Sequence, residues 1–222
     1  MKNTVIFVCV LSCISLVQAA ITVEDLGIGA PPAQLGTGLV YNMVPFANDA
    51  RPTNWDVTSV PAPSGSALLF QNSAGDPQNM EHENISDGTW ATWSHSYAGD
   101  VYSTKTATSV DINLPDKTGA FYFYVESYQF GLYDFQVSVL DDQYQLLRSI
   151  ITLDDVEGNG GARGLGIYSD DGTDAFRIIR IESLVRFGVG EFGIATVPVP
   201  GALMLGALGS TLVAFMRRKR IR

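Results

Sequence analysis

The residues best suited to ligand chemistry are aromatic and lie close together in the middle of the chain. Trp93, His95 and Tyr97 alternate with two serines. If residues 91–97 form a strand, these three side chains share one face, because successive side chains of a strand point to opposite sides. Aromatic rings beside polar groups can stack on sugar rings, so the three residues are the best candidates for binding polysaccharide. The alternative, which is favoured over ligand binding, is that this face belongs to the core.

A second group of residues carries oxygen ligands at short spacing. Asp155, Glu157 and Asn159 recur at every second position and precede a glycine, as in the first half of a calcium-binding loop. Gly166 stands where an EF-hand needs its last carboxylate, so an EF-hand is excluded. A turn-type calcium site using Asp154, Asp155, Glu157 or Asn159 stays open. The alternative is a Gly-rich hairpin whose glycines supply positive φ angles.

The chain offers few residues for catalysis. Its two cysteines, Cys9 and Cys13, lie in a predicted signal peptide, so the mature body has no thiol or disulfide. Its histidines are His82 and His95, and neither has a second histidine at zinc-ligand spacing. For His82, between two glutamates, a solvated loop is favoured over a metal site. We predict no catalytic residue, and a hydrolase using paired carboxylates is the alternative.

The segments that position these residues are predicted to be β-strands. Period-two patterns and short β-like runs alternate with turn clusters rich in Gly and Asp. Residues 22–80 are broken by prolines into extended pieces and edge strands. The prediction is one all-β domain over residues 21–196, an antiparallel, jelly-roll-like sandwich. The expected strand runs are 121–125, 135–139, 148–153, 164–168, 176–181 and 186–194.

The run over residues 121–125 is aromatic on both faces. Phe121 and Phe123 point to one side of the strand, and Tyr122 and Tyr124 point to the other. One of these pairs must therefore face a second layer or solvent.

The N-terminus has the features of a secretory signal peptide. Lys2 precedes an apolar stretch from Val5 to Val17, and small residues follow at the cleavage positions. Residues 1–20 are therefore expected to direct the chain to the Sec translocon and to be removed by signal peptidase.

The C-terminus has three parts. Val197, Pro198, Val199, Pro200 and Gly201 form a proline motif, and an uncharged apolar segment runs on to residue 216. As a helix this segment covers about 24 Å, a little less than a hydrocarbon core of about 30 Å. Five basic residues follow and are expected to stay in the cytoplasm. They are Arg217, Arg218, Lys219, Arg220 and Arg222.

This order of elements resembles the PEP-CTERM sorting signal of bacterial exported proteins. The usual core is Val-Pro-Glu-Pro, and Val199 replaces the glutamate here. The resemblance covers residues 197–222. It implies a short transmembrane sorting helix, recognition by an exosortase-type transpeptidase, and transfer of the body to the cell surface or matrix. Parts of residues 84–195 are also similar to uncharacterised bacterial surface proteins with such tails, which implies a β-sandwich but no activity.

Charge is sharply divided along the chain. All 23 acidic residues lie between Glu24 and Glu191. Lys2 and the five tail residues account for six of the 14 basic ones, which leaves eight in the body. An acidic body argues against nucleic acid as a partner. We therefore expect a non-catalytic, exported surface or matrix protein that is structural, adhesive or polysaccharide-associated. The alternative is a secreted hydrolase active on polysaccharide.

Overall fold

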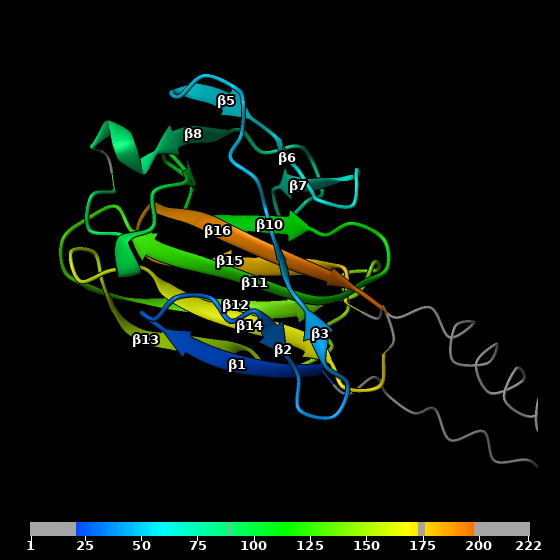
Figure 1. Cartoon of the computed structure of the whole chain (residues 1–222). Helices are drawn as coiled ribbons and strands as arrows, with labels where there is room; N and C mark the ends of the chain where they lie inside the picture. The colour runs from blue at the N-terminus through cyan, green and yellow to red at the C-terminus, as the bar shows by residue number, and fades with distance from the viewer. Residues whose placement is uncertain (1–20, 89, 173–175, 198–222) are drawn as a thin grey trace, which may run out of the picture.

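The computed structural model describes residues 21–88, 90–172 and 176–197 (Figure 1). These residues form antiparallel β-structure with two short 3-10 helices, η1 (Ile85–Asp87) and η2 (Ser94–Ser96), and without an α-helix. The predicted signal peptide, the apolar tail segment and the basic cluster lie outside the described residues. Of the proline motif only Val197 is described, and its N–H donates to the carbonyl of Lys117 at 2.8 Å.

The strands follow one another with few residues between them. They are β1 (Ile21–Gly27), β2 (Gln34–Leu35), β3 (Tyr41–Asn42), β4 (Val44–Pro45), β5 (Trp55–Val57), β6 (Ser59–Pro61), β7 (Ala67–Gln71), β8 (Met80–Asn84), β9 (Asp100–Ser103), β10 (Ser109–Asn113), β11 (Thr118–Ser127), β12 (Leu132–Leu140), β13 (Ile151–Glu157), β14 (Arg163–Ser169), β15 (Ile178–Glu182) and β16 (Phe187–Thr196).

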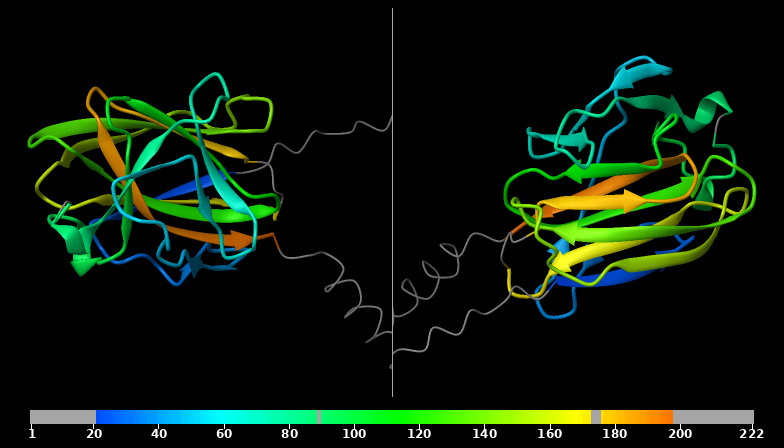
Figure 2. Two further views of the ribbon diagram at one scale, coloured as in Figure 1. Left: turned by 90° about the horizontal axis from the view of Figure 1, so that it is seen from above. Right: turned by 180° about the vertical axis from the view of Figure 1, so that it is seen from behind.

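The strands form two large sheets and one small one. The eight-stranded sheet has the order β1-β14-β11-β16-β9-β8-β5, with β4 also paired to β16. The six-stranded sheet has the order β13-β12-β15-β10-β7-β6, and β2 pairs with β3. From β9 onward the chain passes repeatedly between the large sheets, as the front and back views show (Figures 1 and 2). The all-β, antiparallel prediction is confirmed.

The main core lies between the two large sheets. Phe121, Phe123 and Val125 of β11 point into it and are fully buried. Phe135 of the six-stranded sheet meets Phe187 of the other sheet edge to face, with ring centroids 5.3 Å apart. Burying each such ring contributes about 1.5–3 kcal/mol. The fold is therefore β-sandwich-like, held by apolar side chains from both layers.

A second core covers the outer face of the eight-stranded sheet. Tyr122 and Tyr124 point into it and pack with Leu35 of β2 and with Trp90 and Trp93 of the segment between β8 and β9. Figure 1 shows part of this cover, β2 and β3, in front of the sheet. The tyrosine face of β11 therefore meets a second layer rather than solvent.

Glycines in the neighbouring strands leave room for the tyrosine rings. A Cβ added to Gly193 of β16 would overlap the ring of Tyr122, and one added to Gly164 of β14 would overlap that of Tyr124. The glycines of these strands therefore serve close packing.

The N-terminal third also agrees with expectation. β1, β5 and β6 are edge strands of the two large sheets, and short strands with proline-containing loops make up much of the rest. The strand considered over residues 91–97 is wrong. These residues form a turn and η2, and His95 and Ser96 have φ angles of 42° and 61°.

Candidate functional site

The predicted ligand set of Trp93, His95 and Tyr97 is brought together, with Trp93 buried in the second core and His95 and Tyr97 partly buried beside it. The Trp93 side chain is 5% exposed, and its Nε1–H donates to Glu191 Oε2 at 3.1 Å. Its ring lies 6.2 Å from that of Tyr97. Ligand binding by these residues stays a prediction, and the burial of Trp93 leaves little of its ring open for stacking.

The centre of this cluster is a hydrogen-bonded contact between His95 and Glu191. His95 Nε2 lies 2.6 Å from Glu191 Oε1. Burial raises the pKa of the Glu191 carboxyl, and the hydrogen bond from His95 opposes the rise. Both residues have positive φ angles, 42° for His95 and 51° for Glu191, which non-glycine residues adopt only at a cost. The pair fixes the loop against β16.

His82 also has a structural position. It lies in β8 and is 1% exposed, so the expected solvated loop is wrong. Its Nδ1 lies 3.1 Å from the carbonyl of Pro52. Its Nε2 is 3.1 Å from Asp100 Oδ1, close enough for an ion pair but outside hydrogen-bond geometry. The ring therefore ties β8 to its neighbours.

The calcium candidates occupy a hairpin. Asp154, Asp155 and Glu157 lie in β13, and Asn159 lies in the turn that follows. The N–H of Asp155 donates to Asp134 Oδ1 at 3.0 Å. Within the described ranges no group of three His, Cys, Asp or Glu side chains is arranged to hold a metal ion. Calcium binding by these residues stays a prediction.

The glycines of this turn have separate structural roles. Gly161 has a φ of 105°, as the hairpin interpretation expects. Gly158 instead packs against the hairpin between β11 and β12, where a Cβ would overlap the carbonyl of Gln129. Its N–H donates to the carbonyl of Gly131 at 3.0 Å. Two hairpin tips are thus docked side by side.

A cleft of about 460 Å³ opens beside these docked tips. Three segments line it: the turn after η1, the end of β11 with its hairpin, and the tip between β13 and β14. Its volume is within the range of about 300–1,000 Å³ typical of small-molecule sites. The side chains that give it its chemistry are Trp90, Thr92, Glu126, Tyr128, Phe130 and Asn159.

Glu126 is the charged side chain of this cleft. It continues the outward-facing series of Tyr122 and Tyr124 along β11, and it is 1% exposed. Thr92 Oγ1 donates to its Oε1 at 2.7 Å, while its Oε2 has no hydrogen-bond partner among the described residues. Burial raises the pKa of Glu126 to about 7, against the opposing hydrogen bond from Thr92.

Aromatic rings form the walls and rim of the cleft. The rings of Trp90 and Tyr128 meet edge to face, 5.6 Å apart. Arg186 lies over the Tyr128 ring at 3.2 Å, and Trp90 Nε1–H donates to Glu83 Oε2 at 2.9 Å. Phe130, at the hairpin tip, is 79% exposed. The cleft therefore combines open apolar ring surface with a buried carboxyl oxygen.

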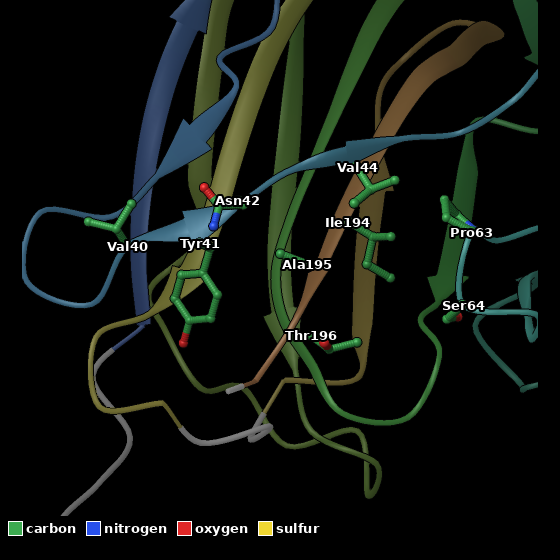
Figure 3. A pocket seen from close by; sticks show the side chains of 9 residues that line it. All are labelled: Val40, Tyr41, Asn42, Val44, Pro63, Ser64, Ile194, Ala195 and Thr196. Atoms are coloured by element: carbon green, nitrogen blue, oxygen red, sulfur yellow. The ribbon is translucent and has the colours of Figure 1, made fainter. Parts of the chain in front are cut away.

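Another hollow, of about 380 Å³, lies beside the end of β16 (Figure 3). Val44, Ile194 and Pro63 contribute apolar surface to it, and none of its lining residues is charged. The Tyr41 hydroxyl donates to the carbonyl of Ser169 at 2.8 Å, so this polar group is already engaged. The hollow offers shape but less chemistry than the cleft at Glu126.

Sequence reasoning missed Glu126, Tyr128 and Phe130. One signal was present: an acidic residue directly follows the apolar run 121–125, and two aromatics stand at the next turn.

None of the described helices is long and apolar enough to cross a membrane. No protein-family model and no curated protein matches the chain.

Proposed function

We propose that this chain is an exported, non-catalytic protein of the cell surface or extracellular matrix, associated with polysaccharide. The observation that carries the proposal is the cleft, in which the exposed ring of Phe130 lies near the buried carboxyl of Glu126. Aromatic faces and hydrogen-bonding groups are the two features that sugar recognition requires. The acidic, cysteine-free body suits a soluble extracellular domain.

The route of export is proposed from the two ends of the sequence. Residues 1–20 are assigned to the Sec translocon and signal peptidase. Residues 197–222 are assigned to membrane insertion and then to an exosortase-type transpeptidase, which removes the tail. Val197 directly follows β16, so the tail would leave the body without a long linker.

The body between these signals is proposed to be a jelly roll. Two strand orders support this assignment: β9-β16-β11-β14 in one sheet faces β10-β15-β12-β13 in the other. Eight strands distributed over two sheets are typical of that architecture. Both hairpin tips of the cleft belong to these eight strands.

Two measurements on the producing cell test the proposal. The intact mass of the protein recovered from the surface should correspond to a chain without residues 1–20 and without the tail. The same material should co-sediment with the cell's extracellular polysaccharide. An intact tail at the surface would contradict processing, and a protein left in the supernatant would contradict polysaccharide association.

The second candidate is a polysaccharide hydrolase. One observation favours it: the pKa of Glu126 is raised to about 7, the value expected of a general acid at neutral pH. Most glycosidases need a second carboxylate on the other side of the scissile bond. Release of reducing ends from the polysaccharide, abolished by Glu126→Gln, would establish this function instead.

A further inference from the structure

We infer that the cleft between Trp90, Glu126 and Phe130 is a binding site for uncharged hexopyranose rings of a polysaccharide. A sugar ring would pack on the exposed aromatic surface, and one of its hydroxyls would donate to Glu126 Oε2. The inference rests on the proposed polysaccharide association and identifies its site. It also moves the site away from Trp93, His95 and Tyr97.

One carboxyl oxygen of Glu126 is buried without a hydrogen-bond partner among the described residues. A buried acceptor without a hydrogen bond costs about 1–3 kcal/mol. Thr92 satisfies Oε1, but no described group donates to Oε2, although the residue is 1% exposed and lines the cleft. A ligand hydroxyl is a donor of the right kind, so binding would remove this cost.

The Tyr128 ring and the backbone that carries Phe130 are held in place before any ligand arrives. Tyr128 is fixed by Arg186 above its ring and by its own N–H, which donates to the Arg186 carbonyl at 3.1 Å. The Phe130 hairpin is docked on the Gly158 turn. Rigid rings lose little conformational entropy on binding. An exposed phenylalanine held beside a cleft is therefore suited to a sugar face.

The charged groups around the cleft favour an uncharged ligand. Glu126 lines the cleft, and Glu83 accepts a hydrogen bond from Trp90, one of its walls. Arg186 lies over the Tyr128 ring and is not among the lining residues. An anionic sugar would therefore lie against the Glu126 carboxyl without a cation among the described lining residues. A cationic ligand would require ionised Glu126, the form that burial disfavours. An uncharged ring avoids both costs.

The test is calorimetric titration of the mature protein with three neutral hexasaccharides: cellohexaose, N-acetylchitohexaose and maltohexaose. At least one should bind at concentrations up to about 5 mM, which corresponds to a few kcal/mol. Phe130→Ala should weaken that binding about tenfold or more. Trp55→Ala, which removes an aromatic side chain that is 59% exposed on β5 outside the cleft, should leave it unchanged.

Glu126→Gln tests the acceptor itself, in titrations of wild type and variant at about pH 8.5, above the pKa of about 7, where the Glu126 carboxyl is ionised and accepts hydrogen bonds. Thr92 would hold the amide oxygen, so the amide nitrogen would replace Oε2 and could not accept a hydroxyl. We expect at least a several-fold loss of affinity, with Glu24→Gln as the matched exposed control. A thermal melt of each variant establishes that the fold is retained.

Three results would overturn the inference. The first is that none of the three sugars binds. The second is that Phe130→Ala and Glu126→Gln both bind with wild-type affinity. The third is that the cationic glucosamine hexamer binds more tightly than the neutral hexasaccharides. Failure of the site is separable from failure of the proposed function. If Phe130→Ala still co-sediments with the matrix polysaccharide as wild type does, the polysaccharide association stands and this site is wrong.

Discussion

Replacement of Glu126 by glutamine should stabilise the protein at alkaline pH and leave it nearly unchanged at acid pH. Burial raises the pKa of this carboxyl from 4.5 to about 7. A raised folded-state pKa means that the group's stabilising contribution is fully present below about pH 4.5. It is lost as the pH rises through about 7, because the folded protein must then hold a buried charge. Glutamine cannot ionise and does not suffer this loss.

The size of the effect follows from the same values. At about 1.36 kcal/mol per pKa unit, the rise gives an upper bound of about 3.4 kcal/mol. The carboxyl lines a cleft that is open to solvent, and screening there reduces the expectation to about 1–2 kcal/mol. In a domain of this size such a gain would raise the melting temperature by about 2–8 °C.

Urea unfolding at about pH 4 and about pH 8 measures the difference directly. Glu126→Gln and wild type should have closely similar free energies of unfolding at the lower pH, and the variant should be more stable at the higher one. Glu24→Gln, with the same chemical change at an exposed position, should show no such divergence. A Glu126→Gln variant that is equally or less stable than wild type at about pH 8 would refute the burial argument.

Three further substitutions test the packing, and Phe130→Ala serves as an exposed comparison. Asp111 is 1% exposed and accepts two 2.7 Å hydrogen bonds from the Arg180 guanidinium. Arg180→Ala would leave this buried carboxylate unpaired and should lower the free energy of unfolding, measured in urea, by about 2–4 kcal/mol. Gly193→Ala would force a Cβ against the Tyr122 ring and should cost about 1–3 kcal/mol, visible as a lower melting temperature. Trp93→Ala should cost about 3–5 kcal/mol by the same measure, whereas Phe130→Ala should change stability by less than about 0.5 kcal/mol. A stable Trp93→Ala protein would contradict its assignment to the second core.

The strands could be predicted because their signals are local. The alternation of Phe135 to Val139 and the aromatic run at 121–125 follow from one buried and one covered face, and both lie inside the observed β12 and β11. Glycine and aspartate clusters between the runs predicted where strands end. Edge strands in the proline-containing N-terminal part followed from the missing N–H of proline.

The binding surface could not be predicted because it depends on long-range packing. The sequence left both a binding face and a core face open for Trp93 and His95. Contacts with Glu191, almost a hundred residues later, hold Trp93 in the second core and His95, partly buried, beside it. The Glu126 cleft joins three segments whose proximity is set by the sheet order, in particular by the contact between Gly158 and the β11–β12 hairpin. No spacing in the sequence records that contact.

The most direct test of the central claim, that the body binds polysaccharide without cleaving it, is a calorimetric titration of the surface-recovered protein with the producing cell's own matrix polysaccharide. We predict a saturable binding heat that returns to baseline after each injection, and about tenfold weaker binding by Phe130→Ala. The absence of a binding heat, or a sustained heat of turnover that Glu126→Gln abolishes, would contradict it.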